Sequence, residues 1–225
     1  MPSIMGTLYL VRHGQASLGA ADYDQLSPLG QLQSRHLGAW LRERGLCFDA
    51  VLTGTLRRHA QTLAGIEEGL QARHDALALP GLDEYDSHAV VRAIHPGPLA
   101  APDTPERARQ HFALLRQGLR QWMAGAIQPE GMPAHGDFVA SVVHALDHVR
   151  SKHSDGTVLV VSSGGPIAAA ISHVLGLGAD ATIEINMHIR NTALSELKVS
   201  SSRHTLITFN TLPHLDGDAA SVSYA

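Results

Sequence analysis

The chain alternates short apolar runs with amphipathic segments, a pattern that predicts strands alternating with helices. Thr7–Val11 and Thr157–Val161 are uncharged apolar runs, typical of buried strands. Shorter runs at Asp49–Thr53 and Ala76–Leu79 are each expected to form a strand as well. Because helical segments separate the first three runs, the order predicts a mostly parallel sheet covered by helices on both faces, an α/β fold.

Two helices are predicted between the first three strands. Ser27 is a typical N-cap and Pro28 a typical first helical residue, and Gly45 is expected to end this helix. Apolar residues at helical spacing then define one buried face on each helix. The first face comprises Leu29, Leu32, His36, Leu37, Trp40 and Leu41, and the second comprises Leu56, Ala60, Leu63, Ile66 and Leu70.

The second half of the chain predicts further helices and two late strands. Ser87–Pro105 is rich in Pro, Ala and Gly and indicates a loop or lid. Helical stripes then start at Thr104-Pro105 and around Phe138. Ala193–Leu197 and Thr205–Phe209 are expected to pair at the edge of the sheet. We therefore predict one domain over residues 1–225, with a lid or insertion at about 85–136 and a flexible tail after about residue 213.

Composition limits the classes of function. With 225 residues, 44% hydrophobic and 17% charged, the chain is an ordinary globular protein. Its net charge of −4 favours no binding to nucleic acid or to anionic membranes. Cys47 alone forms neither an internal disulfide nor a Cys-x-x-Cys metal site. No signal peptide and no membrane span is visible, so a cytoplasmic location is expected.

The 15 histidines raise the question of a metal site. They are scattered along the chain, and no His-Glu-x-x-His run is present. The sequence therefore predicts no metal and no cofactor.

Arg12-His13-Gly14 follows directly on the first apolar run. In open α/β sheets, ligands bind at the carboxyl ends of the strands. A guanidinium can bind phosphate through two hydrogen bonds, and a histidine can act as a nucleophile or as an acid or base. Gly14 lets a ligand approach the backbone N–H. The tripeptide is a candidate ligand site, with a chance tripeptide at a strand end as the alternative.

Three other polar segments are expected at the same edge of the sheet. Arg57 and Arg58 begin the helix after the second strand, and Glu84 follows the third. The turn Ser162–Gly165 leads into a helix whose free N–H groups can hold an anion. The arginines could instead form a solvated face, and Glu84 an exposed turn. Together, the arginines, imidazole, carboxylate and helix N-terminus predict a site for a phosphoryl group.

Two other chemistries are disfavoured by the motifs. The nucleophile elbow of an α/β-hydrolase needs Gly-x-Ser-x-Gly, but Val161 lies two residues before Ser163, and Val160 two before Ser162. No Gly-x-x-x-x-Gly-Lys loop is present, which disfavours a P-loop nucleotide hydrolase.

The chain resembles the histidine phosphatase superfamily, also called phosphoglycerate mutase-like, from Thr7 to about Leu197. The matching stretches are LYLVRHGQAS, LSPLGQLQ, TLRRHAQT, LDEYD, VLVVSSGGPIAA and NTALSEL. The resemblance implies a three-layer α/β/α sandwich and a phosphohistidine intermediate formed without a metal.

The resemblance also assigns roles to single residues. His13 corresponds to the nucleophile, and Arg12 and Arg58 to the residues that bind the phosphoryl oxygens. Arg58 is chosen over Arg57 because the family arginine lies three residues before the Gln-Thr pair. Glu84 corresponds to the acid that protonates the leaving oxygen and then activates water. Gly14, Ser163 and Gly164 complete the predicted phosphate-binding set.

One position departs from the family pattern. The family motif Val-Ser-His-Gly-Gly carries a second histidine, and this chain has Ser163 in its place. Loss of one preorganised donor costs roughly 10²–10³ in rate. We therefore expect a slower enzyme, with a neighbouring histidine or a water held by Ser163 as candidates to fill the gap. On the same argument, Ser163→His is expected to raise the rate.

Three functions remain open. The first is a phosphatase that hydrolyses phosphomonoesters through phospho-His13. The second is a phosphoglycerate mutase, although Ser87–Pro105 offers only His88, Arg92 and His95 to hold a second phosphate. The third is a weakly active protein that binds a phosphorylated ligand. The expected partner is a small phosphorylated substrate, and a homodimer through an edge strand is an alternative to a monomer.

Overall fold

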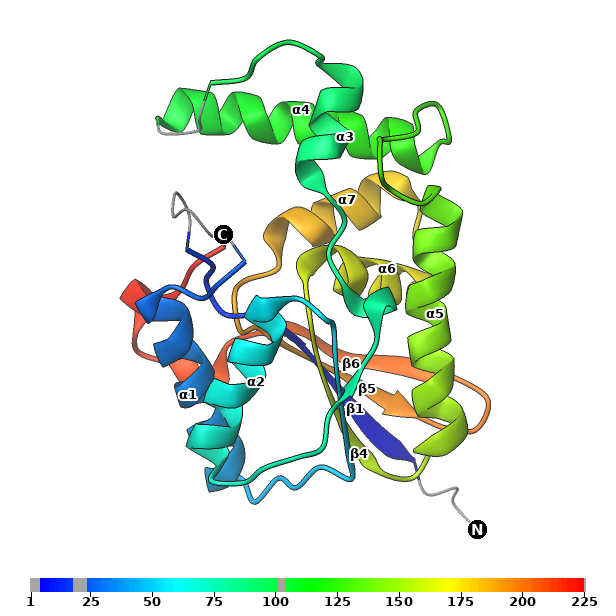
Figure 1. Cartoon of the computed structure of the whole chain (residues 1–225). Helices are drawn as coiled ribbons and strands as arrows, with labels where there is room; N and C mark the ends of the chain where they lie inside the picture. The colour runs from blue at the N-terminus through cyan, green and yellow to red at the C-terminus, as the bar shows by residue number, and fades with distance from the viewer. Residues whose placement is uncertain (1–4, 18–23, 101–103, 225) are drawn as a thin grey trace.

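The computed structural model describes residues 5–17, 24–100 and 104–224. Six strands form one mixed sheet in the order β3-β2-β4-β1-β5-β6 (Figure 1). The first four in this order are mutually parallel: β3 (Leu77–Ala78), β2 (Ala50–Thr53), β4 (Thr157–Ser162) and β1 (Gly6–Arg12). β5 (Leu194–Val199) is antiparallel to β1, and β6 (His204–Thr211) is antiparallel to β5. The mostly parallel sheet is therefore confirmed.

Side chains of the central strands alternate between two apolar cores. Leu8 and Leu10 of β1 pack into one core, and Val11 packs into the other. Val160 and Val161 of β4 divide in the same way. Successive side chains of a strand point to opposite faces, so a run that is apolar at every position must be covered on both sides. The uninterrupted apolar runs are explained by this double covering.

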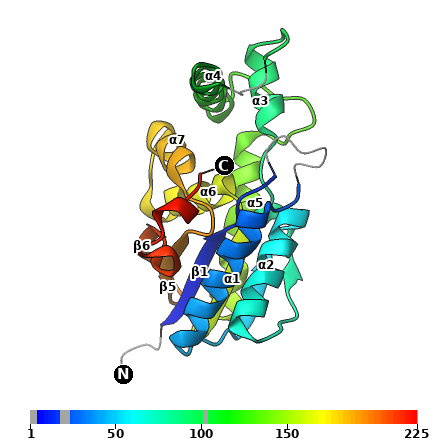
Figure 2. The same ribbon diagram turned by 90° about the vertical axis from the view of Figure 1, so that its left-hand side faces the viewer.

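Helices cover both faces of the sheet, which confirms the three-layer α/β/α arrangement. α1 (Pro28–Glu43) and α2 (Arg57–Leu70) pack side by side on one face (Figure 2). α5 (His135–Lys152) and α6 (Gly164–Leu175) cover the other face. The predicted start of α1 is confirmed, because the Ser27 hydroxyl accepts a hydrogen bond from the Gly30 N–H.

The predicted buried faces of α1 and α2 are partly wrong. Leu32 and Ala60 are exposed, whereas Gln33 and Ser34 are buried. Ser34 is buried where the two helices approach closely, since a Cβ at Gly65 would lie 2.7 Å from the Ser34 Cβ and one at Gly38 would lie 2.0 Å from the carbonyl oxygen of Ile66. Gln33 is buried by its hydrogen bonds to Gln15, Ser221 and Ser223 instead. Hydrophobicity alone therefore does not mark the buried face of α1.

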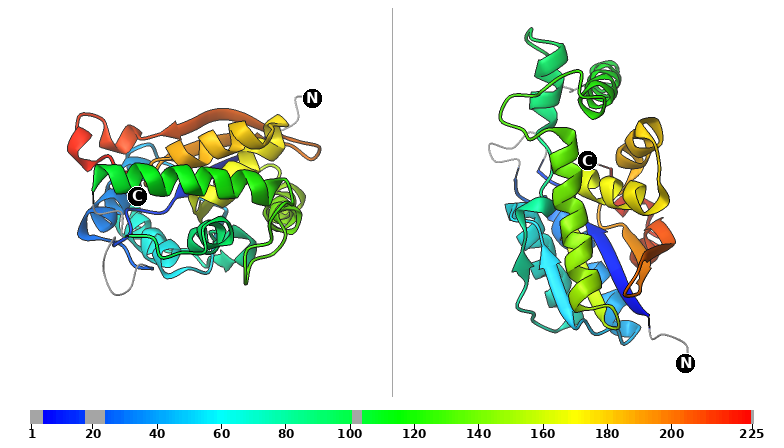
Figure 3. Two further views of the ribbon diagram at one scale, coloured as in Figure 1. Left: turned by 90° about the horizontal axis from the view of Figure 1, so that it is seen from above. Right: turned by 90° about the vertical axis from the view of Figure 1, so that its right-hand side faces the viewer.

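The segment predicted as a loop from Ser87 to Pro105 contains a helix, α3 (Ser87–Ile94). The Asp86 carboxylate caps this helix, and Ala89, Val90 and Val91 are buried. The long helix α4 (Pro105–Met123) follows, as predicted, and contacts α3. Both lie beyond the carboxyl ends of the parallel strands, and α4 crosses the molecule when it is seen from that end (Figure 3).

Two further parts of the chain differ from the prediction. α7 (Ala179–His188) was not expected from the sequence. The tail predicted to be flexible after about residue 213 instead forms two short 3-10 helices, Pro213–Leu215 and Ala219–Ser221. The Gln33 side chain donates to the Ser221 carbonyl, so this tail packs against α1. No helix in the described part of the chain is long and apolar enough to cross a membrane.

Candidate active site

His13 lies at the carboxyl end of β1, and its imidazole is held in one tautomer. Its Nδ1 lies 2.7 Å from the carbonyl oxygen of Gly14. A carbonyl oxygen can only accept a hydrogen bond, so Nδ1 must carry the proton. Nε2 of the neutral ring therefore keeps its lone pair. The arrangement leaves Nε2 as the nucleophilic atom.

The charge state of His13 follows from its surroundings. The side chain is only 3% exposed. Burial lowers the pKa of His13 well below its usual value, and the nearby cations of Arg12 and Arg58 lower it further. The imidazole is therefore neutral at neutral pH, as a nucleophile must be.

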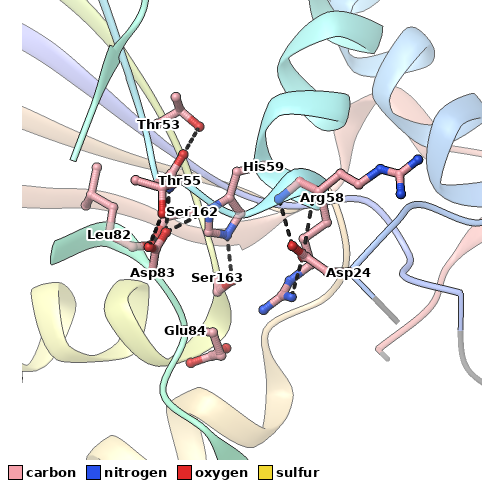
Figure 4. Close-up of polar contacts among 12 residues, drawn as sticks. Asp24, Thr53, Thr55, Arg58, His59, Leu82, Asp83, Glu84, Ser162 and Ser163 are labelled. Atoms are coloured by element: carbon pink, nitrogen blue, oxygen red, sulfur yellow. Dashed lines mark hydrogen bonds and ion pairs between the residues drawn. The ribbon is translucent and has the colours of Figure 1, made fainter. Parts of the chain in front are cut away.

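The two predicted phosphate-binding arginines have defined contacts. Arg12 donates through Nη1 to the main-chain carbonyls of Ile189 and Tyr224, 2.6 Å from the latter. Arg58 donates through Nη1 to Asp24, with 2.8 Å between nitrogen and oxygen (Figure 4). Both cations act electrostatically on His13 and on Glu84. The structure therefore brings these residues into one site.

Glu84 lies against the N-terminus of α6, close to Ser163 (Figure 4). Its carboxylate accepts from the Gly165 N–H, at 3.0 Å to Oε1 and 3.2 Å to Oε2. Burial raises the pKa of Glu84, while the hydrogen bond from Gly165 and the cations of Arg12 and Arg58 oppose the rise. A carboxyl group with a raised pKa is suited to donate a proton near neutral pH.

The backbone N–H of Gly14, predicted to be open to a ligand, donates to the Thr62 hydroxyl in this structure. A Cβ at Gly14 would lie 2.5 Å from the Gly30 carbonyl oxygen, so the glycine allows β1 to pack against the start of α1. Gly164 is buried at the predicted turn, and the Gly165 N–H at the start of this helix donates a hydrogen bond to Glu84.

The sequence suggested a neighbouring histidine beside Ser163 without identifying it, and the structure shows that it is His59. The Ser163 Oγ lies 2.7 Å from Nε2 of His59, and neither residue is exposed to solvent. The His59 Nδ1 faces Oδ1 of Asp83 at 3.6 Å. The His59 and His13 rings lie with their centroids 5.8 Å apart. A histidine therefore stands beside Ser163, at the position where the family pattern led us to expect a histidine.

A signal for His59 was present in the sequence. His59 precedes Leu63 by four residues and Ile66 by seven, which is the spacing of one helix face. Ala60 was expected on this face, but the structure exposes Ala60 and buries His59. A buried histidine at the start of a helix that faces a phosphoryl site is a candidate functional residue.

Comparisons with known proteins identify the family and agree with the fold. The family model for the histidine phosphatase superfamily (branch 1) matches residues 8–212. A 2,3-bisphosphoglycerate-dependent phosphoglycerate mutase of Methylorubrum populi is 30% identical, with 79% of this chain and 92% of that protein covered.

Solved structures of phosphatases and mutases share the fold. A phosphoglycerate mutase of Bacillus anthracis superposes with a TM-score of 0.63 at 17% identity, covering 95% of this chain and 96% of the other. A mycobacterial glucosyl-3-phosphoglycerate phosphatase superposes with a TM-score of 0.60 at 21% identity, covering 91% and 98%. Because the family model matches residues 8–212 of its 225 residues, this chain belongs to the histidine phosphatase superfamily.

Proposed function

We propose that the protein is a phosphomonoesterase that works without a metal and forms a phosphohistidine on His13. The observation that carries the proposal is the tautomer of His13, with Nδ1–H donated to Gly14 and the Nε2 lone pair free to attack. The neighbouring cations of Arg12 and Arg58 support it, because they match the charge of a phosphoryl group.

In the first step, Nε2 of His13 attacks phosphorus and the bond from phosphorus to the ester oxygen breaks. Arg12 and Arg58 stabilise the negative charge on the phosphoryl oxygens. Glu84 gives its proton to the leaving oxygen, and its raised pKa supports this role. The product alcohol leaves, and the phosphoryl group stays on His13.

In the second step, water attacks the phosphohistidine. The Glu84 carboxylate, now ionised, takes a proton from the water as its oxygen bonds to phosphorus. The bond from Nε2 to phosphorus breaks, and inorganic phosphate and neutral His13 are released. Glu84 is again protonated, so the cycle closes.

The mutase is the second candidate, because curated relatives such as that of Methylorubrum populi are mutases. A mutase must hold a second phosphate while the substrate reorients. Within residues 87–105, His88, Arg92 and His95 are the basic groups, and Arg92 forms an ion pair with Asp86 at 3.7 Å. This small positive charge favours hydrolysis over transfer.

Two assays separate the candidates. The phosphatase is expected to release inorganic phosphate from an aryl phosphate, with the activity lost in His13→Ala. With 3-phosphoglycerate, the phosphatase gives glycerate and phosphate, whereas a mutase gives 2-phosphoglycerate. Equal inactivity of the wild type and His13→Ala, with phosphate still bound, would instead identify a binding protein.

A further inference from the structure

His59 links the phosphoryl site to the partly buried carboxylate of Asp83. Its Nε2 lies 2.7 Å from the Ser163 hydroxyl, and its Nδ1 lies 3.6 Å from Asp83 Oδ1 (Figure 4). The three side chains come from the start of α2, the turn before α6 and the segment after β3. Neither His59 nor Ser163 is exposed to solvent.

Asp83 is ionised and attracts the Nδ1 proton of His59 across 3.6 Å. The Asp83 carboxylate accepts from the N–H of Thr55 at 2.6 Å and from the Thr55 hydroxyl. Burial alone would raise the pKa of Asp83, but the contacts with His59 and Thr55 lower it overall. Since a carboxylate attracts an N–H, the Nδ1 that faces Asp83 carries the proton.

The backbone makes room for this pair at Gly54. A Cβ at Gly54 would lie 2.2 Å from Nδ1 of His59 and 2.5 Å from Oδ1 of Asp83. Any other residue would displace the imidazole or the carboxylate. The glycine at the end of β2 is therefore a requirement for the pair.

Four ionisable groups act on His59. Burial lowers the pKa of its imidazole, Asp83 raises it, Arg58 lowers it and Asp24 raises it. His13 is the fourth, through the ring contact. The net direction is downward, so His59 is neutral at neutral pH when no ligand is bound. Its Nε2 then accepts the hydrogen bond from Ser163, and the hydroxyl has no proton left to offer a ligand.

We propose that His59, backed by Asp83 and acting through the Ser163 hydroxyl, supplies the donor that the replaced histidine would have given to the phosphoryl group. The proposal rests on the proposed phosphatase function. His59 is a positioning residue here, because Ser163 is the group that touches the ligand.

The relay works by uptake of one proton. When an anionic phosphoryl group binds beside Ser163, its negative charge favours an imidazolium at His59. Nε2 takes a proton from solvent and donates it in a hydrogen bond to the serine oxygen. The Ser163 hydroxyl then turns and donates its own proton to a phosphoryl oxygen. When phosphate leaves, His59 returns the proton to solvent.

This arrangement changes the expectation for Ser163→His. The Ser163 hydroxyl already contacts the His59 ring, so a histidine at position 163 in the same direction would overlap it. We expect Ser163→His alone to be no faster than the wild type. The double variant His59→Ala with Ser163→His removes the obstacle and is expected to be faster than Ser163→His.

The direct test is a titration of the His59 ring by NMR, with and without saturating inorganic phosphate. The His59 signal is assigned by its loss in His59→Gln. Phosphate is expected to raise the pKa of His59 in the wild type. The rise is expected to be smaller in Asp83→Asn, which keeps the acceptor for Thr55, and smaller again in Ser163→Ala, where only the charge of phosphate acts on His59.

Kinetics supply the second readout. With an aryl phosphate, His59→Gln and Ser163→Ala are each expected to lower kcat by about 10- to 100-fold, and their double variant by no more than the larger single effect. His74→Gln is the matched control. It breaks another histidine–carboxylate pair, with Glu67 at 3.4 Å, beyond the far end of α2, and is expected to leave kcat unchanged. Thermal denaturation of each variant checks that it is folded.

The outcomes separate the relay from the function on which it rests. If the wild type hydrolyses no phosphomonoester, the phosphatase proposal itself is wrong. If the wild type hydrolyses the ester but phosphate leaves the pKa of His59 unchanged, the relay is wrong while the function stands. Additive effects of His59→Gln and Ser163→Ala on kcat would contradict it equally.

Discussion

Glu84 Oε1 lies 3.0 Å from the backbone nitrogen of Gly165, so the N-terminus of α6 holds the predicted general acid. A Cβ at Gly165 would lie 2.2 Å from the same oxygen. We predict that Gly165→Ala displaces the carboxylate and lowers kcat by about 10²-fold, within the range for general acid–base catalysis. Steady-state assays with an aryl phosphate measure this. Gly178→Ala, where a Cβ would meet no atom within 4 Å, is the control and should retain wild-type kcat.

The loss of rate in Glu84→Gln is predicted to depend on the acidity of the leaving alcohol. Because the variant cannot protonate the leaving oxygen, alkyl phosphates should lose at least about 10² in kcat, whereas an aryl phosphate with an acidic phenol should lose less. The rates of a series of esters, plotted against the pKa of the leaving alcohol, give the measurement. An equal loss for all esters would show that Glu84 is not the acid.

The pH profile should extend to the acid side. Burial lowers the pKa of His13 well below 6.5, so the nucleophile stays neutral as the pH falls below that value. Glu84 has a raised pKa, so its acid form persists above the usual range of a carboxyl group. We expect kcat/KM to decline on the acid side with protonation of His13, well below pH 6.5, and on the basic side with ionisation of Glu84. An acid limb near pH 6.5 would place His13 in a more solvated site.

His214 is predicted to make stability depend on pH. Its Nε2 lies 2.9 Å from the Thr192 hydroxyl, and burial, with a contribution from His36, lowers its pKa to about 4. The unfolded chain binds this proton below about pH 6.5, so the stabilisation from His214 is lost between about pH 6.5 and 4. As the pH falls over that interval, the free energy of unfolding of His214→Gln should drop by up to about 3 kcal/mol less than that of the wild type. Urea unfolding at a series of pH values measures this. The same dependence of the free energy of unfolding on pH in both proteins would contradict the prediction.

The C-terminal segment is predicted to support the site through Arg12. The carbonyl of Tyr224 accepts from Arg12 Nη1, and the carbonyl of Ser223 accepts from the Asn191 N–H. Deletion of residues 218–225 should therefore raise KM several-fold through loss of the contact that orients Arg12. The inhibition constant for inorganic phosphate measures the same effect without turnover. Unchanged KM and phosphate inhibition would show that the contact with Tyr224 is not needed to orient Arg12.

The fold was largely predictable because its strongest signals are local. The runs around Leu8 and Val158 are apolar at every position, which only a doubly covered strand explains. Ser27 and Pro28 marked the start of α1 through cap chemistry that depends on neighbours in sequence. The 3-10 helices of the tail were missed because they depend on tertiary contacts, such as that of Gln33 with Ser221, which no local pattern reveals. α3 does carry a local signal, the N-cap Asp86, but the Pro, Ala and Gly content of the segment favoured a loop.

The members of the candidate site were proposed from the sequence, but the contacts among them were not. The resemblance to the family assigned roles to His13, Arg58 and Glu84, and these roles stay predictions. The structure places the three residues in one region, where Arg58 acts electrostatically on both His13 and Glu84. The contact between His59 and Ser163 joins positions 104 apart in sequence, so it becomes visible only once the fold is known. The absence of a motif histidine at Ser163 pointed to a gap, and the structure places an imidazole directly behind it.

In the proposed mechanism, Nε2 of His13 is the atom that carries the phosphoryl group. The protein is mixed with a ³²P-labelled phosphomonoester and quenched rapidly, which traps the phosphoenzyme. The stability of the label in acid and in alkali then shows whether phosphorus is bonded to nitrogen or to oxygen. A label that is lost in acid, kept in alkali and absent from His13→Ala is the predicted result, because a phosphorus–nitrogen bond is labile to acid. A label that survives acid and disappears in Ser163→Ala would show a phosphoserine, and would contradict the account.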